Sequence, residues 1–404
     1  IMSKQYNLLL LLIFATLVSC EPEINDFTPD AGNADFSVFV ALGGSETAGF
    51  ANNELYKSTQ IVSFPNIISR QLLHIGGEEF IQPLMRDELG FGNRLVLDLL
   101  ADCLQDSIIW AVPASGLPDE DNMMNIFEEE GAFHNLGVPF ARISHLTMPL
   151  NETEGYFYQY FARFASSPDT SPLSDALALQ PTFFSLWTGL SDILDFAASG
   201  GTDFPITDPE EFNTQLTSIL QQLTATAKGG VIGNLPDVLQ FPYFTYIPAA
   251  GLWAVDSMSE NGIRMLQESE LVLLPAALEI RCQQLGSEQN PLPENLYLNA
   301  AQVELINNRI DAFNMIIREK ADTYNLALAD INTLIQATAS GLVFDGVHFN
   351  NEYLSGGVFS VDGISLSRRG NAIIANTFIN AINKNYNSTI PRVSVTQFQS
   401  IAYP

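Results

Sequence analysis

The chain has 404 residues, of which 47% are hydrophobic and 16% are charged, so it is long and apolar enough to bury a large core. Its formal net charge of −29 repels phosphate backbones and argues against nucleic-acid binding. The densest acidic clusters, Glu128 to Glu130 and Asp208 to Glu211, are short and are typical of solvated charge. No pattern indicates a metal, nucleotide or haem site, so we expect no cofactor.

The N-terminus resembles an export signal. Residues 8–18 form an apolar run that is too short to span a bilayer, and it ends in Leu17-Val18-Ser19-Cys20. This pattern is typical of a lipoprotein signal, so we expect residues 1–20 to be removed up to Cys20 and that cysteine to carry the lipid. An ordinary secretory signal with an incidental cysteine is the alternative. Residues 21–35 are polar and acidic, which predicts a flexible tether. The protein is thus expected to be exported and membrane-anchored in the cell envelope, with the leaflet left open.

Buried strands and amphipathic helices alternate along the remaining chain, residues 36–404, which we expect to form one domain with loop insertions. Strands that are apolar throughout indicate a parallel sheet that is covered on both faces. The sequence therefore predicts an α/β fold, namely a three-layer α/β/α sandwich with a mostly parallel central sheet. The strands are expected at 36–42, 182–188, 229–235 and 326–330, and the helices at 61–74, 209–227, 302–324 and 367–385.

Three long loops, at 76–135, 145–180 and 240–300, are expected to decorate one edge of this domain. A ligand site is expected beyond the carboxyl ends of the strands, where Gly43-Gly44-Ser45 follows the first strand. Cys103 and Cys282 remain after the signal, and an oxidising compartment permits a disulfide. Their separation along the chain says nothing of their distance in space, so the pairing stays open.

The segment from Ala41 to Gly49, ALGGSETAG, resembles the first block of the SGNH (GDSL-type) hydrolases, which usually reads GDSLTAG. Further segments resemble the later blocks in the same order: Asn135 to Phe140, Trp187 to Asp192, and Phe359 to Ser365 followed by Arg369-Gly370. The resemblance spans roughly residues 36–395 and is greatest to exported lipoprotein members. It implies a flavodoxin-like hydrolase fold and a serine ester hydrolase of the lipase, esterase or glycan deacetylase type.

The resemblance also assigns roles to individual positions, and several of these positions are changed. Ser45 matches the nucleophile and Asp362 the aspartate that orients a histidine, but the histidine position is Ser365. The glycine of the second block is Phe140, whose ring we expect to fill part of the substrate space. The asparagine of the third block, an oxyanion donor, is Ser191, and the aspartate before the nucleophile is Gly44.

These changes are expected to leave little ordinary esterase activity. Loss of the general base of a serine triad costs on the order of 10⁴ in turnover, and loss of one oxyanion donor costs about 10²–10³. Without a base, the hydroxyl of Ser45 stays protonated at neutral pH. A hydroxyl after two glycines is also a good helix N-cap, so Ser45 could be retained for structure alone.

Another histidine could replace the missing base. His348 lies in Asp345-Gly346-Val347-His348, which mimics the family's DGxH pattern, and its loop could fold over the cleft and bring His348 to Ser45. The alternative is a surface histidine in a loop. His134 stands next to the second block and could also line the cleft. Arg368 and Arg369 could pair with acidic neighbours or bind an anionic ligand.

Two functions follow. The first is an SGNH-fold lipoprotein of the cell envelope with lost or strongly reduced hydrolase activity, which binds an acyl ester, a glycan or an envelope protein. The alternative is an active serine ester hydrolase that uses Ser45 and Asp362 with a displaced histidine. An accessory subunit of an envelope protein is a third possibility, with residues 241–246 as an apolar contact surface, although these residues could equally pack under a long loop.

Overall fold

A computed structural model describes residues 28–401 of the chain. Its centre is a five-stranded sheet in the order β11-β6-β5-β1-β4, in which every pair of neighbours is parallel. The expected parallel sheet is therefore confirmed, and its strands are almost entirely buried because both faces are covered. The strands are β1 (Phe39–Gly43), β4 (Asn135–Gly137), β5 (Phe183–Trp187), β6 (Gly229–Gly233) and β11 (Ala327–Ala329).

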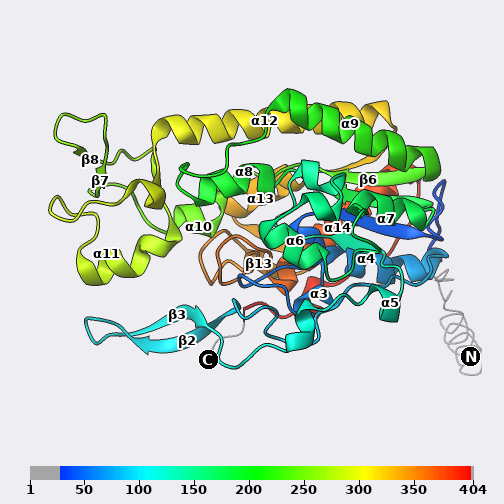
Figure 1. The fold of residues 1–404 in the computed structure, drawn as a ribbon, viewed down its shortest axis with the longest axis horizontal. Helices are drawn as coiled ribbons and strands as arrows, with labels where there is room; N and C mark the ends of the chain where they lie inside the picture. The colour runs from blue at the N-terminus through cyan, green and yellow to red at the C-terminus, as the bar shows by residue number, and fades with distance from the viewer. Residues whose placement is uncertain (1–27, 402–404) are drawn as a thin grey trace, which may run out of the picture.

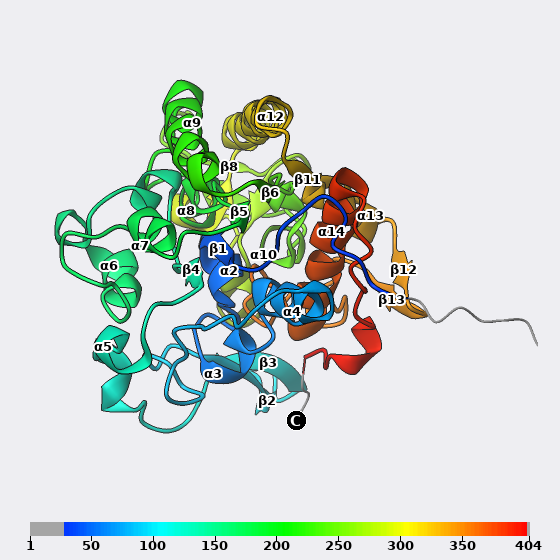
Figure 2. The ribbon, with the colours of Figure 1, turned by 90° about the vertical axis from the view of Figure 1, so that its right-hand side faces the viewer.

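Helices cover the sheet on both faces, as Figure 2 shows. On one side lie α8 (Ser191–Ala198), α9 (Pro209–Thr226) and α12 (Ala300–Thr323), and on the other lie α4 (Phe64–Leu72) and α14 (Arg368–Tyr386). Aromatic pairs join each layer: the Phe212 and Phe313 rings stack with centroids 3.9 Å apart, and those of Phe64 and Phe378 are 4.8 Å apart. The expected three-layer sandwich is thus confirmed.

The ends of these helices follow the local sequence. Asp208 caps α9 by accepting the backbone N–H of Glu210, and a proline follows at the first helical position. Asn299 and Gln302 form a reciprocal capping box at the start of α12. Ser367 caps α14 by accepting the backbone N–H of Gly370 at 2.9 Å. These caps place the helix starts within about two residues of their expected positions.

Short elements lie outside the main sheet and its long helices, most of them in the segments expected to be long loops and many at the left of Figure 1. The strand pairs are β2 (Leu95–Ala101) with β3 (Ser107–Pro113), β7 (Trp253–Val255) with β8 (Ile263–Met265), β9 (Leu271–Val272) with β10 (Tyr297–Leu298), and β12 (Leu342–Phe344) with β13 (Val347–Phe349). The shorter helices are α2 (Ser45–Ala48), α3 (Lys57–Gln60), α5 (Phe127–Glu130), α6 (Gly155–Phe161), α7 (Pro172–Ala178), α10 (Pro242–Thr245), α11 (Ala277–Gln283) and α13 (Ile331–Ala339).

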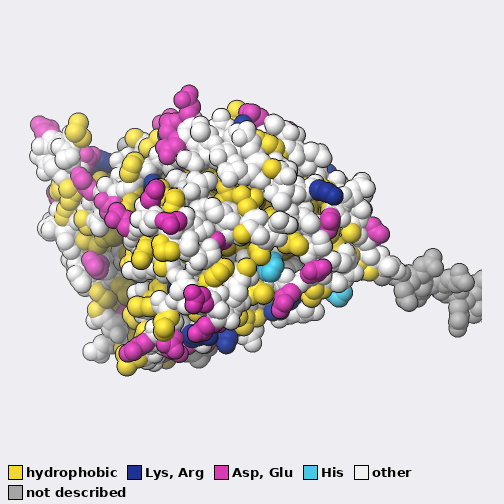
Figure 3. Space-filling view, turned by 45° about the vertical axis from the view of Figure 1, so that its right-hand side comes forward, with side chains coloured by type: hydrophobic (Ala, Val, Ile, Leu, Met, Phe, Trp, Pro, Cys, Tyr) yellow, Lys and Arg dark blue, Asp and Glu magenta, His cyan; other side chains and the backbone are white. Residues whose placement is uncertain are grey.

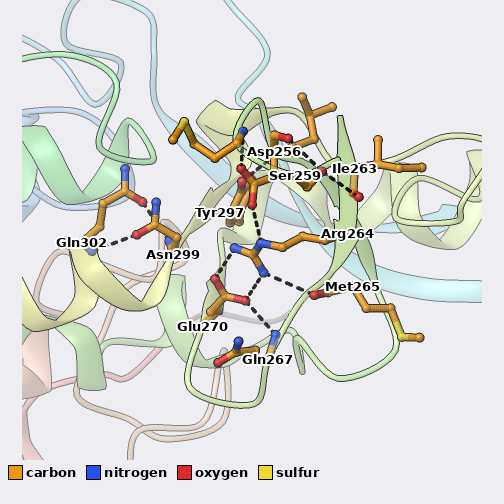
Figure 4. A network of polar contacts seen from close by, with 12 residues as sticks. Asp256, Ser259, Ile263, Arg264, Met265, Gln267, Glu270, Tyr297, Asn299 and Gln302 are labelled. Atoms are coloured by element: carbon orange, nitrogen blue, oxygen red, sulfur yellow. Dashed lines mark hydrogen bonds and ion pairs between the residues drawn. The ribbon is translucent and has the colours of Figure 1, made fainter. Parts of the chain in front are cut away.

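The insertion at 240–300 has a small apolar core of its own, separate from the main one. A polar network stiffens it (Figure 4): the Arg264 guanidinium donates to both carboxylate oxygens of Glu270, at 2.6 and 2.7 Å, and to Asp256 at 2.6 Å. The Glu270 side chain is buried, and bidentate pairing satisfies its charge. The insertion is therefore a built subdomain and not a loose loop.

The pairing of the two remaining cysteines, which the sequence left open, is settled by the structure. Cys103 and Cys282 form a disulfide across a sequence separation of 179 residues. It fixes the tip of the β2-β3 hairpin to the end of α11, and ion pairs of Arg281 with Asp102 and Asp106 support the same junction. An arm of the main domain is thereby tied to the inserted subdomain.

The predicted signal peptide and Cys20 lie outside the described residues. The predicted tether extends to residue 35, but hydrogen bonds to the main domain begin earlier. Asp30 and Thr389 exchange two hydrogen bonds of 2.8 Å, and Asn33 donates to the Tyr386 carbonyl at 2.8 Å. Residues 30–33 are therefore fixed against the C-terminal end of α14.

The surface reflects the composition. On the face that Figure 3 shows, acidic side chains are spread over the molecule and basic ones are few. In the part of the chain that the structure describes, every helix is too short or too polar to cross a bilayer.

Candidate active site

Ser45 lies where the fold predicts a reactive group, directly beyond the carboxyl end of β1 and at the first residue of α2. Gly43 ends the strand, and a Cβ there would lie 2.2 Å from both the Trp187 carbonyl oxygen and the Thr47 hydroxyl. Only glycine lets the chain turn this tightly. The turn leaves Ser45 half-buried, with its Oγ accepting a hydrogen bond of 3.0 Å from the backbone N–H of Phe140.

Phe140 adopts the backbone conformation of the glycine whose position it occupies, with φ at 63°. This conformation directs its N–H at Ser45, so the backbone donor of an oxyanion site persists despite the substitution. The ring packs in an aromatic cluster, with centroid distances of 5.2 Å to Phe50, 5.4 Å to Tyr156 and 6.3 Å to Tyr160. The ring, which the sequence predicts to fill part of the substrate space, thus packs against neighbouring aromatic side chains.

Ser191 and Gly44 lie side by side next to Ser45. Ser191 is buried at the start of α8, and a Cβ at Gly44 would lie 3.8 Å from its hydroxyl oxygen. The space around Gly44 is open enough for a side chain, since the nearest atom to such a Cβ, the Ala141 carbonyl oxygen, is 3.5 Å away. The structure thus brings together Gly44, Ser45, Phe140 and Ser191, as the sequence predicts.

Asp362 holds a turn and does not orient a base. Its Oδ1 accepts the backbone N–H groups of Ile364 at 2.9 Å and Ser365 at 2.8 Å, and its Oδ2 accepts the backbone N–H of Asn53 at 2.8 Å. Ser365 is buried, with a hydroxyl where the family has an imidazole. The turn that presents the histidine is therefore retained without the histidine.

His348 is not brought to Ser45. It lies exposed on β13 opposite Val343 of β12, and a Cβ at Gly341 would lie 2.9 Å from its Nε2. Strand pairing fixes this hairpin, so the expected delivery of His348 into the cleft is wrong. The physical reason is that the DGVH segment forms the turn and second strand of a hairpin, a role that its sequence pattern does not distinguish from a catalytic loop.

His134 also lies away from the nucleophile. It precedes β4, and its carbonyl accepts the backbone N–H of Ala41, which places it level with the middle of β1. At about 3.3 Å per residue, Ser45 is on the order of 13 Å further along the strand direction. The His134 Nδ1 accepts the backbone N–H of Ile81 at 3.1 Å, and burial lowers the pKa of this histidine.

His145, to which the sequence analysis gave no role, is likewise structural. Its Nδ1 accepts the backbone N–H of Arg142 at 3.2 Å, and its ring packs on Phe157 with centroids 4.5 Å apart. Burial and the nearby Arg142 charge lower its pKa to about 4. His74 is exposed at the end of a helical turn. Within residues 28–401, no histidine is hydrogen-bonded to Ser45.

Glu46 is a site residue that sequence reasoning missed. It follows Ser45 directly and faces a small apolar cavity lined by Trp187, Leu190 and Phe359 among others. Burial, and to a lesser extent repulsion from Asp362, raises the pKa of Glu46 to about 7. A signal was present in the first block, because the family has leucine after the serine and this chain has an acid.

The arrangement therefore combines a serine, a backbone N–H donor and a carboxyl group that titrates near neutral pH. It lacks the base that would activate the serine through a histidine. No group of three or more metal-binding side chains occurs in the described part of the chain, so the site offers no metal centre. What remains is a serine hydroxyl with a backbone N–H donor, and within residues 28–401 no histidine is hydrogen-bonded to that hydroxyl.

Comparisons with known proteins agree with this geometry. A family model described as GDSL-like Lipase/Acylhydrolase matches residues 40–378. No curated protein matches the chain.

Solved structures align over most of the chain. An α/β-hydrolase enzyme from the metagenome of Lake Arreo is 12% identical, with 87% of this chain and 96% of that one covered and a TM-score of 0.40. A GDSL-like lipase from Parabacteroides merdae is 14% identical, with 88% and 99% covered and a TM-score of 0.39. A catalytic mutant of an acetylxylan esterase from Geobacillus stearothermophilus is 11% identical, with 86% and 95% covered and a TM-score of 0.39.

Proposed function

The chain belongs to the GDSL-like lipase/acylhydrolase family, and from that premise we propose that it is an envelope lipoprotein of this family with lost or strongly reduced ester hydrolase activity. In this proposal the cleft at Ser45 serves to bind a ligand or an envelope partner. The observation that carries it is the absence of any histidine hydrogen-bonded to Ser45 in residues 28–401, where the hydroxyl instead accepts the Phe140 N–H.

Two features support the loss of turnover. Ser365 supplies a short hydroxyl where a base is needed, and the carboxylate of Asp362 is already bound by three backbone N–H groups. The removal of the base alone costs on the order of 10⁴ in rate. The retained N–H of Phe140 preserves part of the oxyanion site, which is compatible with binding an ester carbonyl without cleaving it.

The test is fluorophosphonate labelling of the purified full chain together with turnover of short-chain nitrophenyl esters. Ser45→Ala is the matched control, because it removes one oxygen and leaves the turn intact. We expect labelling and turnover equal to those of Ser45→Ala. The proposal of lost activity is contradicted if the parent protein is labelled and turns over the esters while Ser45→Ala does neither.

A second candidate, weak hydrolase activity with Glu46 as the base, is favoured by one observation: a carboxyl group with a pKa of about 7 adjoins the nucleophile. Such a group accepts a proton effectively near neutral pH. In that case Ser45-dependent turnover would rise as the pH passes 7 and would disappear in Glu46→Gln. Turnover that is retained in Glu46→Gln excludes this base.

The anchoring part of the proposal rests on the cysteine that ends the signal-like segment. Growth with an alkyne-bearing fatty acid should label the parent protein in the membrane fraction, whereas Cys20→Ala should remain unlabelled. A labelled Cys20→Ala protein, or an unlabelled parent, contradicts lipid attachment at Cys20.

A further inference from the structure

A cavity of about 310 Å³ has two charged side chains in its lining, and both are arginines. Its walls include Tyr56, Arg94, Ser360 and Arg368, with residues 399–401 at its edge. This is unusual in a chain that has 17 basic and 46 acidic residues. We propose that this cavity binds a phosphoryl group of a ligand between the guanidinium groups of Arg94 and Arg368.

Arg368 makes no direct ion pair within residues 28–401. It is the first residue of α14, and its Nη2 donates to the Ser58 hydroxyl at 2.7 Å, which in turn donates to the Glu88 carboxylate at 2.5 Å. No carboxylate in residues 28–401 lies within ion-pair distance of it, and no hydrogen bond engages its Nε or Nη1 there. Its positive charge also adjoins the N-terminus of a 19-residue helix, whose dipole favours an anion at the same place.

Arg94 is fixed in position but is incompletely satisfied. Its guanidinium carbon lies 4.1 Å from the centroid of the Tyr56 ring, and its Nη1 donates to the Glu88 carbonyl at 2.6 Å. Its Nε is fully buried and has no hydrogen-bond partner, so it faces packed protein and not the cavity. The donor group left for a ligand is Nη2, which makes no hydrogen bond within residues 28–401.

Arg94 and Arg368 line the same cavity as Tyr56. Burial raises the pKa of Tyr56, and the charges of Arg94 and Arg368 act in the opposite direction. The exposed carboxylate of Glu88, 3.7 Å from Arg94, is the one acid that pairs with either arginine in the described chain, so the local balance is one excess positive charge.

The two arginines favour a ligand with a tetrahedral oxyanion. Each guanidinium keeps N–H donors free, and two guanidinium groups together match the several oxygens and double negative charge of a phosphoryl group better than they match a ligand with a single carboxylate. The cavity is larger than an isolated phosphate needs, so the ligand is expected to be a phosphomonoester or a lipid phosphate head group. Both share the recognised group.

This cavity also contacts the turn that carries Asp362. Asn52, in its wall, donates its N–H to the Ser360 hydroxyl at 2.9 Å and accepts the Val361 N–H at 3.2 Å, and the next residue, Asn53, binds Asp362. The wall of the cavity is thus continuous with the turn that carries Asp362.

The experiment measures the melting temperature and binding heat of the full chain with inorganic phosphate, against sodium chloride at matched ionic strength. Arg94→Gln and Arg368→Gln are the test variants, and Arg318→Gln, an exposed arginine on α12, is the matched control. We expect phosphate to raise the melting temperature of the parent and the control. Affinity in either test variant should fall at least tenfold.

A second readout separates binding from a structural role. Without phosphate, Arg368→Gln should melt at the same or a higher temperature than the parent, because it removes like-charge repulsion. Glycerol 3-phosphate and vesicles containing phosphatidic acid then distinguish a soluble ester from a lipid head group. The proposal is overturned when none of the three phosphates binds more tightly than chloride, or when binding persists in Arg94→Gln and Arg368→Gln.

Discussion

The carboxylate of Asp362 accepts the backbone N–H of Ser365 at 2.8 Å, three residues along the chain, where the family has a histidine. Asp362 therefore holds the backbone of residue 365 in a turn, and the side chain there is a hydroxymethyl group in place of an imidazole. A carboxylate has about four acceptor sites, and three are used here, so one remains for an imidazole N–H.

We therefore predict that Ser365→His gains Ser45-dependent esterase activity. Asp362 would orient the imidazole, which could then take the proton of Ser45. This general-base catalysis raises the rate by on the order of 10³–10⁴ in an intact triad, and we expect about tenfold or more in an imperfect one. Turnover of a short-chain nitrophenyl ester measures this. Ser365→Ala is the size control, and Ser45→Ala in the Ser365→His background must abolish any gain. No gain in a folded variant would show that another part of the cleft blocks catalysis.

At position 140, we expect a glycine variant to be more stable than an alanine variant, although alanine is usually the more stabilising of the two residues. Its φ of 63° is strained for any residue with a Cβ, by about 1–2 kcal/mol, and is free for glycine. Both Phe140→Ala and Phe140→Gly lose the aromatic packing, but only the glycine variant relieves the strain. We expect the free energy of unfolding of Phe140→Gly to exceed that of Phe140→Ala by about 1 kcal/mol. In urea unfolding this appears as a higher midpoint for the glycine variant. Equal midpoints, or a more stable alanine variant, would argue against the left-handed conformation.

Glu46 should make the protein less stable as the pH rises from about 4.5 to 7. Its pKa is about 7 in the folded state against an ordinary value of 4.5, so the folded state binds more protons in this window. The stabilising effect of its proton is present below the lower value and is lost as the pH rises through the upper one. Asp192, whose pKa burial raises to about 6, acts in the same direction.

Urea unfolding at pH 5, 6 and 7 tests the contribution of Glu46. The free energy of unfolding of the parent should fall across this range by about 1–3 kcal/mol more than that of Glu46→Gln, whose amide does not titrate. Parallel pH profiles for the two proteins would mean that Glu46 is solvated and titrates normally.

Removal of the disulfide should loosen the β2-β3 arm. The Cys103→Ser/Cys282→Ser variant loses a link that closes a loop of 179 residues, and such links typically contribute about 2–4 kcal/mol. We expect a lower melting temperature and faster protease cleavage at residues 102–106, with the main domain still folded. A cleavage pattern unchanged from the parent would show that the ion pairs of Arg281 suffice to hold the arm.

The sheet and its layers could be predicted because periodicity and helix caps carry that information locally. Apolar runs such as 182–188 became β5, and Asp208-Pro209 started α9 at the expected residue. The small subdomain of 240–300 was missed, because its strands have only two or three residues and depend on one another for pairing.

The sequence could indicate which residues lie near Ser45, but not what these residues do there. The family blocks correctly gathered Gly44, Ser45, Phe140 and Ser191, since each follows a strand of one sheet. The sequence could not show that DGVH forms a hairpin or that Phe140 adopts a glycine conformation, because register and φ are set by distant contacts. The importance of Glu46 was also hidden, since its burial arises from segments more than 100 residues away.

The hydrogen bonds between residues 30–33 and the end of α14 have a consequence for orientation. If Cys20 is the lipidated residue, the chain from it to Asp30 reaches about 35 Å at most when fully extended. Tyr386, at this docking point, binds Gly230 at the amino end of β6, opposite to the edge that carries Ser45. A lipid on Cys20 would therefore be attached at the amino edge of the sheet, the edge opposite to the one that carries Ser45.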